Sequence, residues 1–299
     1  NGQISSVALM DARSIAATAA NKGYLTSATD LADIEYTHPK YFFDKAIYDR
    51  RVYNGVGKAD PSVEIKFGPN IKDWPEMVPL TDNLLLKVAS VIHDPVTTTD
   101  ELIPSGETSS YRSNPLGLAE FTLSRKDPEY VGRAKAIQAV EKVREAGECM
   151  GKAFPEVKEV MHAIKEKFED VCGSNTGVGS TIYAVKPGDG SAREQAASCQ
   201  KVLGGWANIA KEYATKRYRS NLINWGMLPF VIDKDFDFDN DDYVFIPGVK
   251  DAVKNKTEVI KAYVVNKNFA EIELRLGELT DDERQIITDG CLINYYKYN

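Results

Sequence analysis

Cysteine and histidine, the side chains that most often build metal centres, are scarce in this sequence. Its 299 residues include four cysteines and three histidines, and no two cysteines form a C-x-x-C pair. This spacing argues against a self-contained zinc or iron–sulfur site and against a disulfide framework. It is typical of reduced thiols, so we expect a cytoplasmic protein. The residues concerned are Cys149, Cys172, Cys199, Cys291, His38, His93 and His162.

Long apolar runs and an excess of positive charge are also lacking. No stretch approaches the roughly 18–20 apolar residues that a membrane span needs, so the sequence predicts no membrane partner. The formal net charge is −7, from 37 Lys and Arg against 44 Asp and Glu. A nucleic-acid partner bound through a general basic surface is therefore not expected. A pocket for a small anion stays compatible with a negative total, because the local field decides binding.

What the sequence does have is the composition of a globular protein. Apolar residues make up 43% and charged residues 27%, enough for a sizeable core in one large or two modest domains. An alanine-rich helical pattern over residues 7–20 precedes an irregular, aromatic-rich connector. Such a helix at the edge of a chain is typical of a neighbouring domain. We therefore expect residues 1–60 to be the tail of a preceding domain and a linker, and residues 61–299 to form the second domain.

Hydrophobic periodicity outlines an α/β domain. Strands that alternate with helices predict a partly parallel sheet, which the later strands extend into a mixed one. A charged helical pair, with Asp127 as its first cap, is expected within residues 127–173, before a Gly-, Ser- and Asn-rich loop at 173–179. The predicted strands are 63–67, 83–92, 181–185, 207–210, 228–232, 243–246, 259–265 and 270–274. The other predicted helices are 191–203, 216–224 and one that begins with a capping box at Thr280 and Glu283.

The segment GDGSAREQAA at residues 188–197 joins a predicted strand to a predicted helix. Its glycines let the backbone turn sharply and approach a ligand closely. The start of the following helix presents unpaired N–H groups and the positive end of a dipole, which suit a carboxylate or a phosphate. Backbone donors there could stabilise Ser191 as an oxyanion, and Arg193 could hold a carboxylate with two hydrogen bonds.

Structural roles remain open for the same residues and for other motifs. Ser191 could simply cap its helix, with Arg193 solvated on the helix surface. The aspartates between residues 233 and 242 lack the Gly and Glu that an EF-hand loop needs, so we expect a solvated loop there. His93 shares no metal-ligand spacing with other histidines or cysteines and is expected to be a turn residue.

Several ordered blocks of the sequence resemble the swivel domain of the aconitase family, which includes isopropylmalate dehydratase and homoaconitase. One block is GSAREQAA at residues 190–197, followed by VLGG at 202–205 and NLINWGMLP at 221–229. The other is VTTTDELIPSG at 96–106 with YRSN at 111–114. The resemblance is good over about 94–125 and 186–232, loose over 1–25 and 63–92, and absent over 127–177. It implies a swivelling β/β/α domain with a helical insert at about residues 127–177.

The resemblance also implies roles for individual residues. Ser191 falls on the serine that acts as base and removes a proton from the carbon next to a substrate carboxylate. Arg193 and Arg112 fall on arginines that bind substrate carboxylates, and Ala192 falls on a position that contacts the substrate. The supporting residues that it implies are Asp100, Thr99 and Gly190.

Two of these positions depart from the family pattern. Family members commonly have a second serine where this chain has Ala192, so one hydroxyl contact to the substrate is missing. The histidine that usually follows the aspartate of the Thr-Thr-Asp motif is Glu101 here, which adds negative charge near a site for anions. Both departures bear on the substrate, whereas the two arginines are retained.

The activity that the resemblance implies is that of a hydro-lyase. Such an enzyme reversibly dehydrates and hydrates a hydroxy di- or tricarboxylate, as in tricarboxylic acid metabolism. The family's [4Fe-4S] cluster is held by three cysteines on domains that precede the swivel, and no cysteine here matches them. We therefore expect the cluster on N-terminal domains outside this chain, which would be its partners, and no activity from this chain alone.

Two alternatives remain open at this point. One is the small subunit of a two-chain dehydratase of the isopropylmalate type, although the leading helix and connector speak against it. The other is a non-catalytic relative that binds or senses anions, with Ala192 and Glu101 as signs of lost activity.

Overall fold

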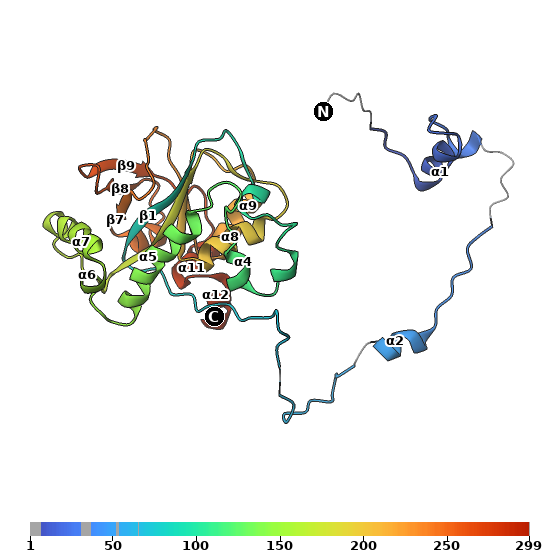
Figure 1. Ribbon diagram of the computed structural model, residues 1–299, viewed down its shortest axis with the longest axis horizontal. Helices are drawn as coiled ribbons and strands as arrows, with labels where there is room; N and C mark the ends of the chain where they lie inside the picture. Colours follow the sequence, from blue (N-terminus) through green and yellow to red (C-terminus); the bar gives the residue numbers. More distant parts are fainter. Residues whose placement is uncertain (1–6, 31–36, 52–53, 65, 299) are drawn as a thin grey trace. The chain divides into compact units, whose positions relative to one another are not determined.

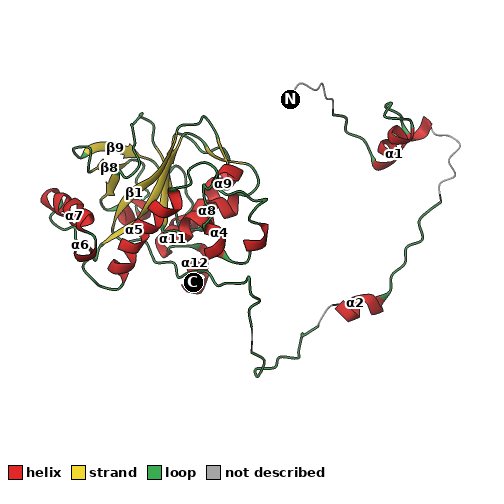
Figure 2. Ribbon diagram, in the orientation of Figure 1, coloured by secondary structure: helices red, strands yellow, loops and turns green. Residues whose placement is uncertain are grey.

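The computed structural model describes residues 7–30, 37–51, 54–64 and 66–298. The chain divides into two compact units, residues 1–64 and 65–299 (Figure 1). The second unit contains a mixed sheet with helices packed around it (Figure 2). The fold is therefore α/β with a mixed, partly parallel sheet, as the periodicity predicted.

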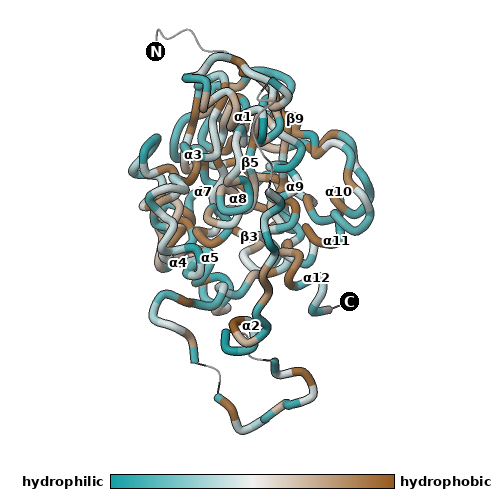
Figure 3. Tube along the Cα trace, turned by 90° about the vertical axis from the view of Figure 1, so that its right-hand side faces the viewer, coloured by the Kyte–Doolittle hydropathy of each residue, from teal (hydrophilic) through white to brown (hydrophobic). Residues whose placement is uncertain are grey.

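The first unit holds short helices. Helix α1 spans Ala12–Ala20 and does not begin at residue 7 as predicted, because Asp11 is extended and caps it. The Asp11 carboxylate accepts hydrogen bonds from the N–H groups of Arg13 and Ser14 at 2.9 and 3.1 Å. A 3-10 turn at Ala28–Asp30 and helix α2 at Lys45–Arg51 interrupt the connector that the sequence predicted to be irregular. Polar and apolar residues are mixed along α2 (Figure 3).

A seven-stranded sheet organises the second unit. Its order is β6-β5-β3-β1-β7-β8-β9. The first four of these strands run parallel, and β7, β8 and β9 continue the sheet in antiparallel fashion. The strands are β1 (Asn83–Ile92), β3 (Thr176–Ala184), β5 (Gly205–Ala210), β6 (Leu228–Val231), β7 (Tyr243–Ile246), β8 (Ile260–Val264) and β9 (Ala270–Leu274).

Strand β1 runs through the middle of the core and is buried on both faces. Leu84 and Leu86 pack into one cluster with Phe230 of β6. Leu85 points to the opposite face, where it joins a cluster with Ile137 of α5 (Tyr130–Glu145). Burial on both sides explains why this strand reads as a nearly continuous apolar run.

Strand β3 is longer than the sequence predicted. It begins at Thr176, inside the stretch expected to be a loop, because its glycines serve close packing and not a turn. A Cβ on Gly177 would lie 2.6 Å from Thr81 Oγ1, and one on Gly179 would lie 2.3 Å from the Trp206 ring. No other residue fits these positions without movement of a neighbour.

The region predicted to be a charged helical pair forms three helices. After α5 come α6 (Met150–Ala153) and α7 (Pro155–Lys167). The prediction that Asp127 caps α5 is wrong, because α5 starts at Tyr130 and Glu129 occupies the cap position. The Asp127 carboxylate instead accepts hydrogen bonds from Ser90 Oγ at 2.6 Å and from Arg133.

The predicted strand at residues 63–67 is also wrong. Ile65 lies outside the described residues, and Val63 and Phe67 on either side are not in a strand and are 65% and 55% exposed. The strands of the large sheet include none from this segment, so among the described residues the alternating pattern pairs with no strand.

Helices close the fold at its C-terminal end. Helix α10 spans Val249–Lys254, α11 spans Asp281–Asp289 and α12 spans Leu292–Tyr298. The capping box predicted at Thr280 and Glu283 is confirmed, with both reciprocal hydrogen bonds present. Within the described parts of the chain, the helices are all too short or too polar to cross a membrane.

Candidate functional site

The glycine-bent loop predicted to carry chemistry lies between a short strand and a helix. Strand β4 (Pro187–Asp189) ends just before Gly190, and α8 spans Arg193–Val202. The cap position of α8 is Ala192, so Ser191 is not the N-cap that the structural alternative required. Because an alanine offers no acceptor, no side chain caps α8. The first N–H groups of α8 thus stay without a side-chain acceptor next to the exposed Ser191 hydroxyl.

The two sequence blocks of the candidate site are joined by a two-stranded sheet. Strand β2 (Thr97–Thr98) runs parallel to β4, with Thr97 opposite Pro187 and Thr98 opposite Asp189. Helix α3 (Thr99–Leu102) follows β2 at once and contacts both β4 and α8. Segments about 90 residues apart in the sequence thus lie side by side.

Thr99 fixes the turn that presents Ser191. Its buried hydroxyl accepts a hydrogen bond from the Ala192 N–H at 3.3 Å. Gly190 has a φ of +134°, and a Cβ there would lie 2.2 Å from Thr99 Oγ1. Glycine is required at this position by both its backbone angle and the close approach of Thr99. The predicted supporting residues Thr99 and Gly190 therefore meet at the start of α8.

We expect Gly190→Ala to lower the free energy of unfolding of the second unit by about 2 kcal/mol, because the change adds a clash to an unfavourable backbone angle. Urea denaturation of the 299-residue chain measures it. In a Thr99→Ala background the nearest remaining atom is Thr99 Cβ at 3.3 Å. Gly190→Ala should then lower the free energy of unfolding by less than it does in the original chain. An equal loss of stability in both backgrounds would contradict the role given to Thr99.

Arg193 is half-buried at the first position of α8, and its Nε atom is buried without a hydrogen-bond partner in the described structure. A buried guanidinium donor left unpaired costs free energy that an anionic acceptor would recover. The neighbouring Glu194 faces away, since its carboxylate accepts a hydrogen bond from Trp225 Nε1 at 3.1 Å. The interpretation of Arg193 as a freely solvated helix residue is therefore wrong.

Arg112 lies on the loop between a 3-10 turn at Ser109–Tyr111 and helix α4 (Pro115–Ala119). Helix α4 packs directly against α8, and the 3-10 turn packs against α4 (Figure 1). The Arg112 side chain is exposed. Within the described residues it forms no hydrogen bond or ion pair, and none joins it to Ser191. The fold thus connects the Arg112 loop to the helix that carries Arg193 through α4, which packs against both α8 and the 3-10 turn.

Asp100 is tied into a charged cluster that the sequence did not reveal. Its carboxylate pairs with Arg125 at 2.8 Å and accepts a hydrogen bond from the Ser105 N–H at 3.1 Å. Arg125 also pairs with Glu107 at 2.7 Å. The adjacent Arg125 and Lys126 were visible as a basic pair, but nothing in the sequence indicated that they meet the Thr-rich block.

Glu101, which replaces the family's histidine, is neutralised locally. It forms a capping box with Thr98 and lies 3.3 Å from Lys126 Nζ. Partial burial raises the pKa of Glu101, but the Thr98 hydrogen bonds and the Lys126 ammonium outweigh this and bring the pKa below its ordinary value. The negative charge that Glu101 was expected to add is therefore present, but it is paired with Thr98 and Lys126.

The acidic run and His93 have structural partners. Asp233 pairs with Arg275 at 2.8 Å, and Asp235 pairs with Lys211 at 2.7 Å. His93 is exposed and packs edge-on against Tyr183, with ring centroids 6.3 Å apart.

Comparison with known proteins finds similarity to one family. The family model of the aconitase C-terminal domain matches residues 166–235, which include Gly190, Ser191, Ala192 and Arg193. This stretch of the chain is similar to an aconitase C-terminal domain. Aconitate hydratase A of Rickettsia bellii is 30% identical over 131 residues, which cover 41% of this chain and 15% of that protein. The structure of 3-isopropylmalate dehydratase (LeuD) from Methanocaldococcus jannaschii aligns over 72% of this chain and 94% of that one, at 22% identity and a TM-score of 0.44.

The match begins earlier than the sequence blocks suggested. It starts at residue 166, near the end of α7, and so includes part of the region expected to be an insert without resemblance. It stops at residue 235 and does not reach the Thr-rich block or Arg112. Their assignment to the aconitase C-terminal domain site stays a prediction that depends on the β2–β4 pairing.

The cysteines of the described residues do not fit the ligand set of an iron–sulfur cluster. Cys149 and Cys172 are exposed, whereas Cys199 and Cys291 are buried. Burial raises the pKa of the Cys199 thiol to about 12, the opposite of what a thiolate ligand needs. No three His, Cys, Asp or Glu side chains in the described ranges are grouped as metal ligands.

Proposed function

We propose that this domain supplies one half of the active site of an aconitase-like hydro-lyase acting on a hydroxy di- or tricarboxylate. Ser191 is the base, and Arg193 and Arg112 bind substrate carboxylates. The observation that carries the proposal is the uncapped start of α8, where the exposed Ser191 lies beside Arg193 with its buried, unpaired Nε. The domain boundaries at residues 60 and 61 and the origin of the first unit in a preceding domain are part of the same proposal.

The start of α8 offers what a serine base requires. A serine hydroxyl has no basicity of its own, and nearby donors must stabilise its anion. The uncapped N–H groups and the positive end of the α8 dipole provide such donors. A proton from the carbon next to a substrate carboxylate would pass to Ser191 Oγ and later return from it. Ala192 N–H takes no part, because it already donates to Thr99.

The arginines would hold and orient the substrate. A guanidinium group binds a carboxylate through two parallel hydrogen bonds, and a bound carboxylate would give Arg193 Nε the partner that it lacks. Arg112, on the loop beside α4, would bind a second carboxylate. Two such contacts suit a substrate with several carboxylates.

The proposal places a [4Fe-4S] cluster on domains outside this chain, because no ligand set for it exists among the described residues. Partner domains that bear the cluster would complete the site, and this chain alone would be inactive. None of the steps given above depends on a ligand from this domain.

Arg193→Lys tests the carboxylate contact in the full-length enzyme. We expect KM for isocitrate to rise by about 10–100-fold with a smaller effect on kcat, because lysine keeps the charge but loses the two-pronged hydrogen bond. Steady-state kinetics measure both constants. Arg217→Lys, at an exposed arginine of α9 (Lys216–Asn224), is the matched control and should change neither. Equal KM values for the two variants would remove Arg193 from the site.

A further inference from the structure

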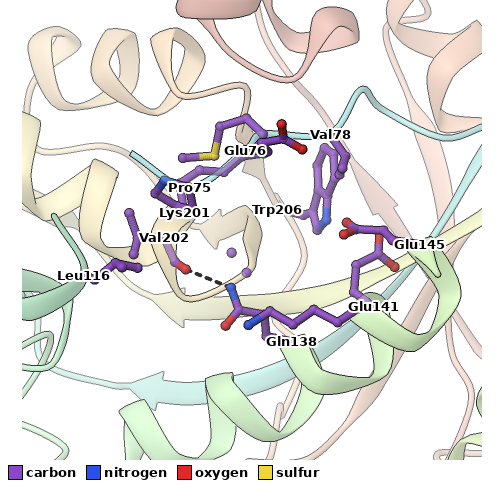
Figure 4. Close-up of a pocket in the computed structure, with 14 residues that line it drawn as sticks. Pro75, Glu76, Val78, Leu116, Gln138, Glu141, Glu145, Lys201, Val202 and Trp206 are labelled. Atoms are coloured by element: carbon purple, nitrogen blue, oxygen red, sulfur yellow. Dashed lines mark hydrogen bonds between the residues drawn. The ribbon is translucent and has the colours of Figure 1, made fainter. Parts of the chain in front are cut away.

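A cavity lies at the other end of α8 from Ser191. It has a volume of about 150 Å³ and is bounded by the end of α8, the start of β5, one side of α5 and residues 75–78 (Figure 4). Gln138 of α5 spans it and donates a hydrogen bond to the Val202 carbonyl at 2.8 Å. None of the residues proposed for the hydro-lyase site lines this cavity.

One of the residues that line the cavity, Lys201, is a buried cation without a hydrogen-bond partner among the described residues. Lys201 is 6% exposed, and its Nζ has no hydrogen-bond partner in the described structure. The ammonium lies 3.7 Å from the centre of the Trp206 ring, which is 3% exposed. A ring face attracts a cation but accepts no conventional hydrogen bond, so the three N–H donors of Lys201 remain unsatisfied. A ligand acceptor at this position would recover that loss.

The mouth of the cavity has the opposite charge. Glu76 and Glu145 are exposed lining residues, and both lie near the Trp206 ring in Figure 4. Burial and the nearby carboxylate of Glu141 raise the pKa of Glu145, and the charge of Glu76 adds to the effect. A cation between Glu76 and Glu145 would relieve their repulsion.

Glu141, the other acid of the wall, is already satisfied. Its carboxylate accepts two hydrogen bonds from Arg144 at 2.7 Å each and one from the Val178 N–H at 2.8 Å. Its oxygens are therefore already engaged by Arg144 and Val178, although its negative charge raises the pKa of Lys201 against the effect of burial. The free charges of the cavity are one cation inside and two carboxylates at the mouth, with the exposed Lys142 at the rim.

We propose that this cavity binds a small amino acid, with the ligand carboxylate on Lys201 and the ligand ammonium group between Glu76 and Glu145. A positive charge inside the cavity and negative charges at its mouth match a ligand that has both a carboxylate and an ammonium group. A ligand with only a carboxylate would be repelled by Glu76 and Glu145, and a ligand with only an amine would be repelled by Lys201. The volume is smaller than that of a drug-sized pocket and fits a ligand of few heavy atoms. α-Amino acids and ω-amino acids share this chemistry and differ in the distance between the two charges.

Calorimetric titration of the 299-residue chain tests the proposal with four probes. They are alanine, 5-aminopentanoate, pentanoate and pentylamine. We expect one of the two amino acids to bind with a dissociation constant of about 1 mM or lower, and the single-charge probes to bind at least about tenfold more weakly. Whichever of alanine and 5-aminopentanoate binds more tightly indicates the distance between the carboxylate and ammonium groups that the cavity prefers. Equal binding of pentanoate, or no binding of either amino acid, would overturn the proposal.

Variants locate the bound ligand. Lys201→Met, which keeps an unbranched side chain of similar length, and the double change Glu76→Gln with Glu145→Gln should each weaken binding by about 10–100-fold, the loss expected for a hydrogen bond to a charged group. Lys152→Met and Glu148→Gln remove charges of the same sign from exposed positions that do not line the cavity, and they should leave binding within about twofold. Circular dichroism establishes that each variant is folded. A folded Lys201→Met variant that binds as the original chain does would refute the site.

Discussion

Ser191→Ala is expected to lower kcat of the full-length enzyme by about 10³-fold while KM for isocitrate changes little. The proposed base would be gone, but the arginines that bind the substrate would remain, and a positioned proton acceptor contributes about 10²–10⁴-fold to rate. The measurement is steady-state turnover of isocitrate by enzyme with its cluster intact. The fold should be unaffected, because the Ser191 side chain is exposed and does not cap α8.

Ser109→Ala is the control for this experiment. Ser109 is an exposed serine in the 3-10 turn next to the Arg112 loop, and its loss should leave kcat unchanged. Turnover by Ser191→Ala equal to that of the control would contradict the assignment of Ser191 as base. Tight binding of isocitrate by the unmodified enzyme without any turnover would favour the non-catalytic alternative.

Lys201→Met is expected to stabilise the second unit at neutral pH by about 2 kcal/mol. Burial lowers the pKa of Lys201 to about 8, although the nearby Cys291, Glu141 and Glu145 act in the opposite direction. Holding this group charged in the folded chain costs free energy that a methionine would not require, partly offset by the lost contact with Trp206. Urea denaturation at pH 7 compares the two proteins.

The pH dependence of the same difference gives a second measurement. The unfolded chain keeps a lysine pKa of 10.5, above the folded value of about 8, so between these pH values the unfolded state binds more protons. The stability of the original chain should therefore rise with pH relative to Lys201→Met, by about 3 kcal/mol across this window. Lys142→Met, at an exposed position, should show no such trend. If the difference in free energy of unfolding between the two proteins does not change between pH 7 and 10, the charged form of Lys201 does not destabilise the folded chain.

Much of the fold followed from local pattern. The strands at Asn83–Ile92, Tyr243–Ile246 and Ala270–Leu274 were predicted with their observed bounds, because each is a compact apolar or alternating run between turn residues. The errors came from residues whose role depends on distant neighbours. Gly177 and Gly179 read as loop residues until Thr81 and Trp206 are seen against them.

The candidate site could also be predicted only in part. The glycines and the helix start at Ser191 are local signals, and family resemblance connected them to the Thr-rich block. The unpaired state of Arg193 and Lys201 was not predictable, because an isolated helix sequence does not show which of its cations are buried. The partners of Glu101 were also not predicted. The sequence contains the residues of the Thr98–Glu101 capping box, but Lys126, which pairs with Glu101, is 25 residues further along the chain.

The pairing of β1 with β3, and of β2 with β4, affects where the second unit can tolerate changes in chain length. Strand ladders fix the chain on both sides of the segment that contains α5, α6 and α7. Insertions in the turn between α6 and α7 should therefore leave the geometry around Gly190 and Thr99 intact, provided that the buried side chains of these helices keep their contacts with the core.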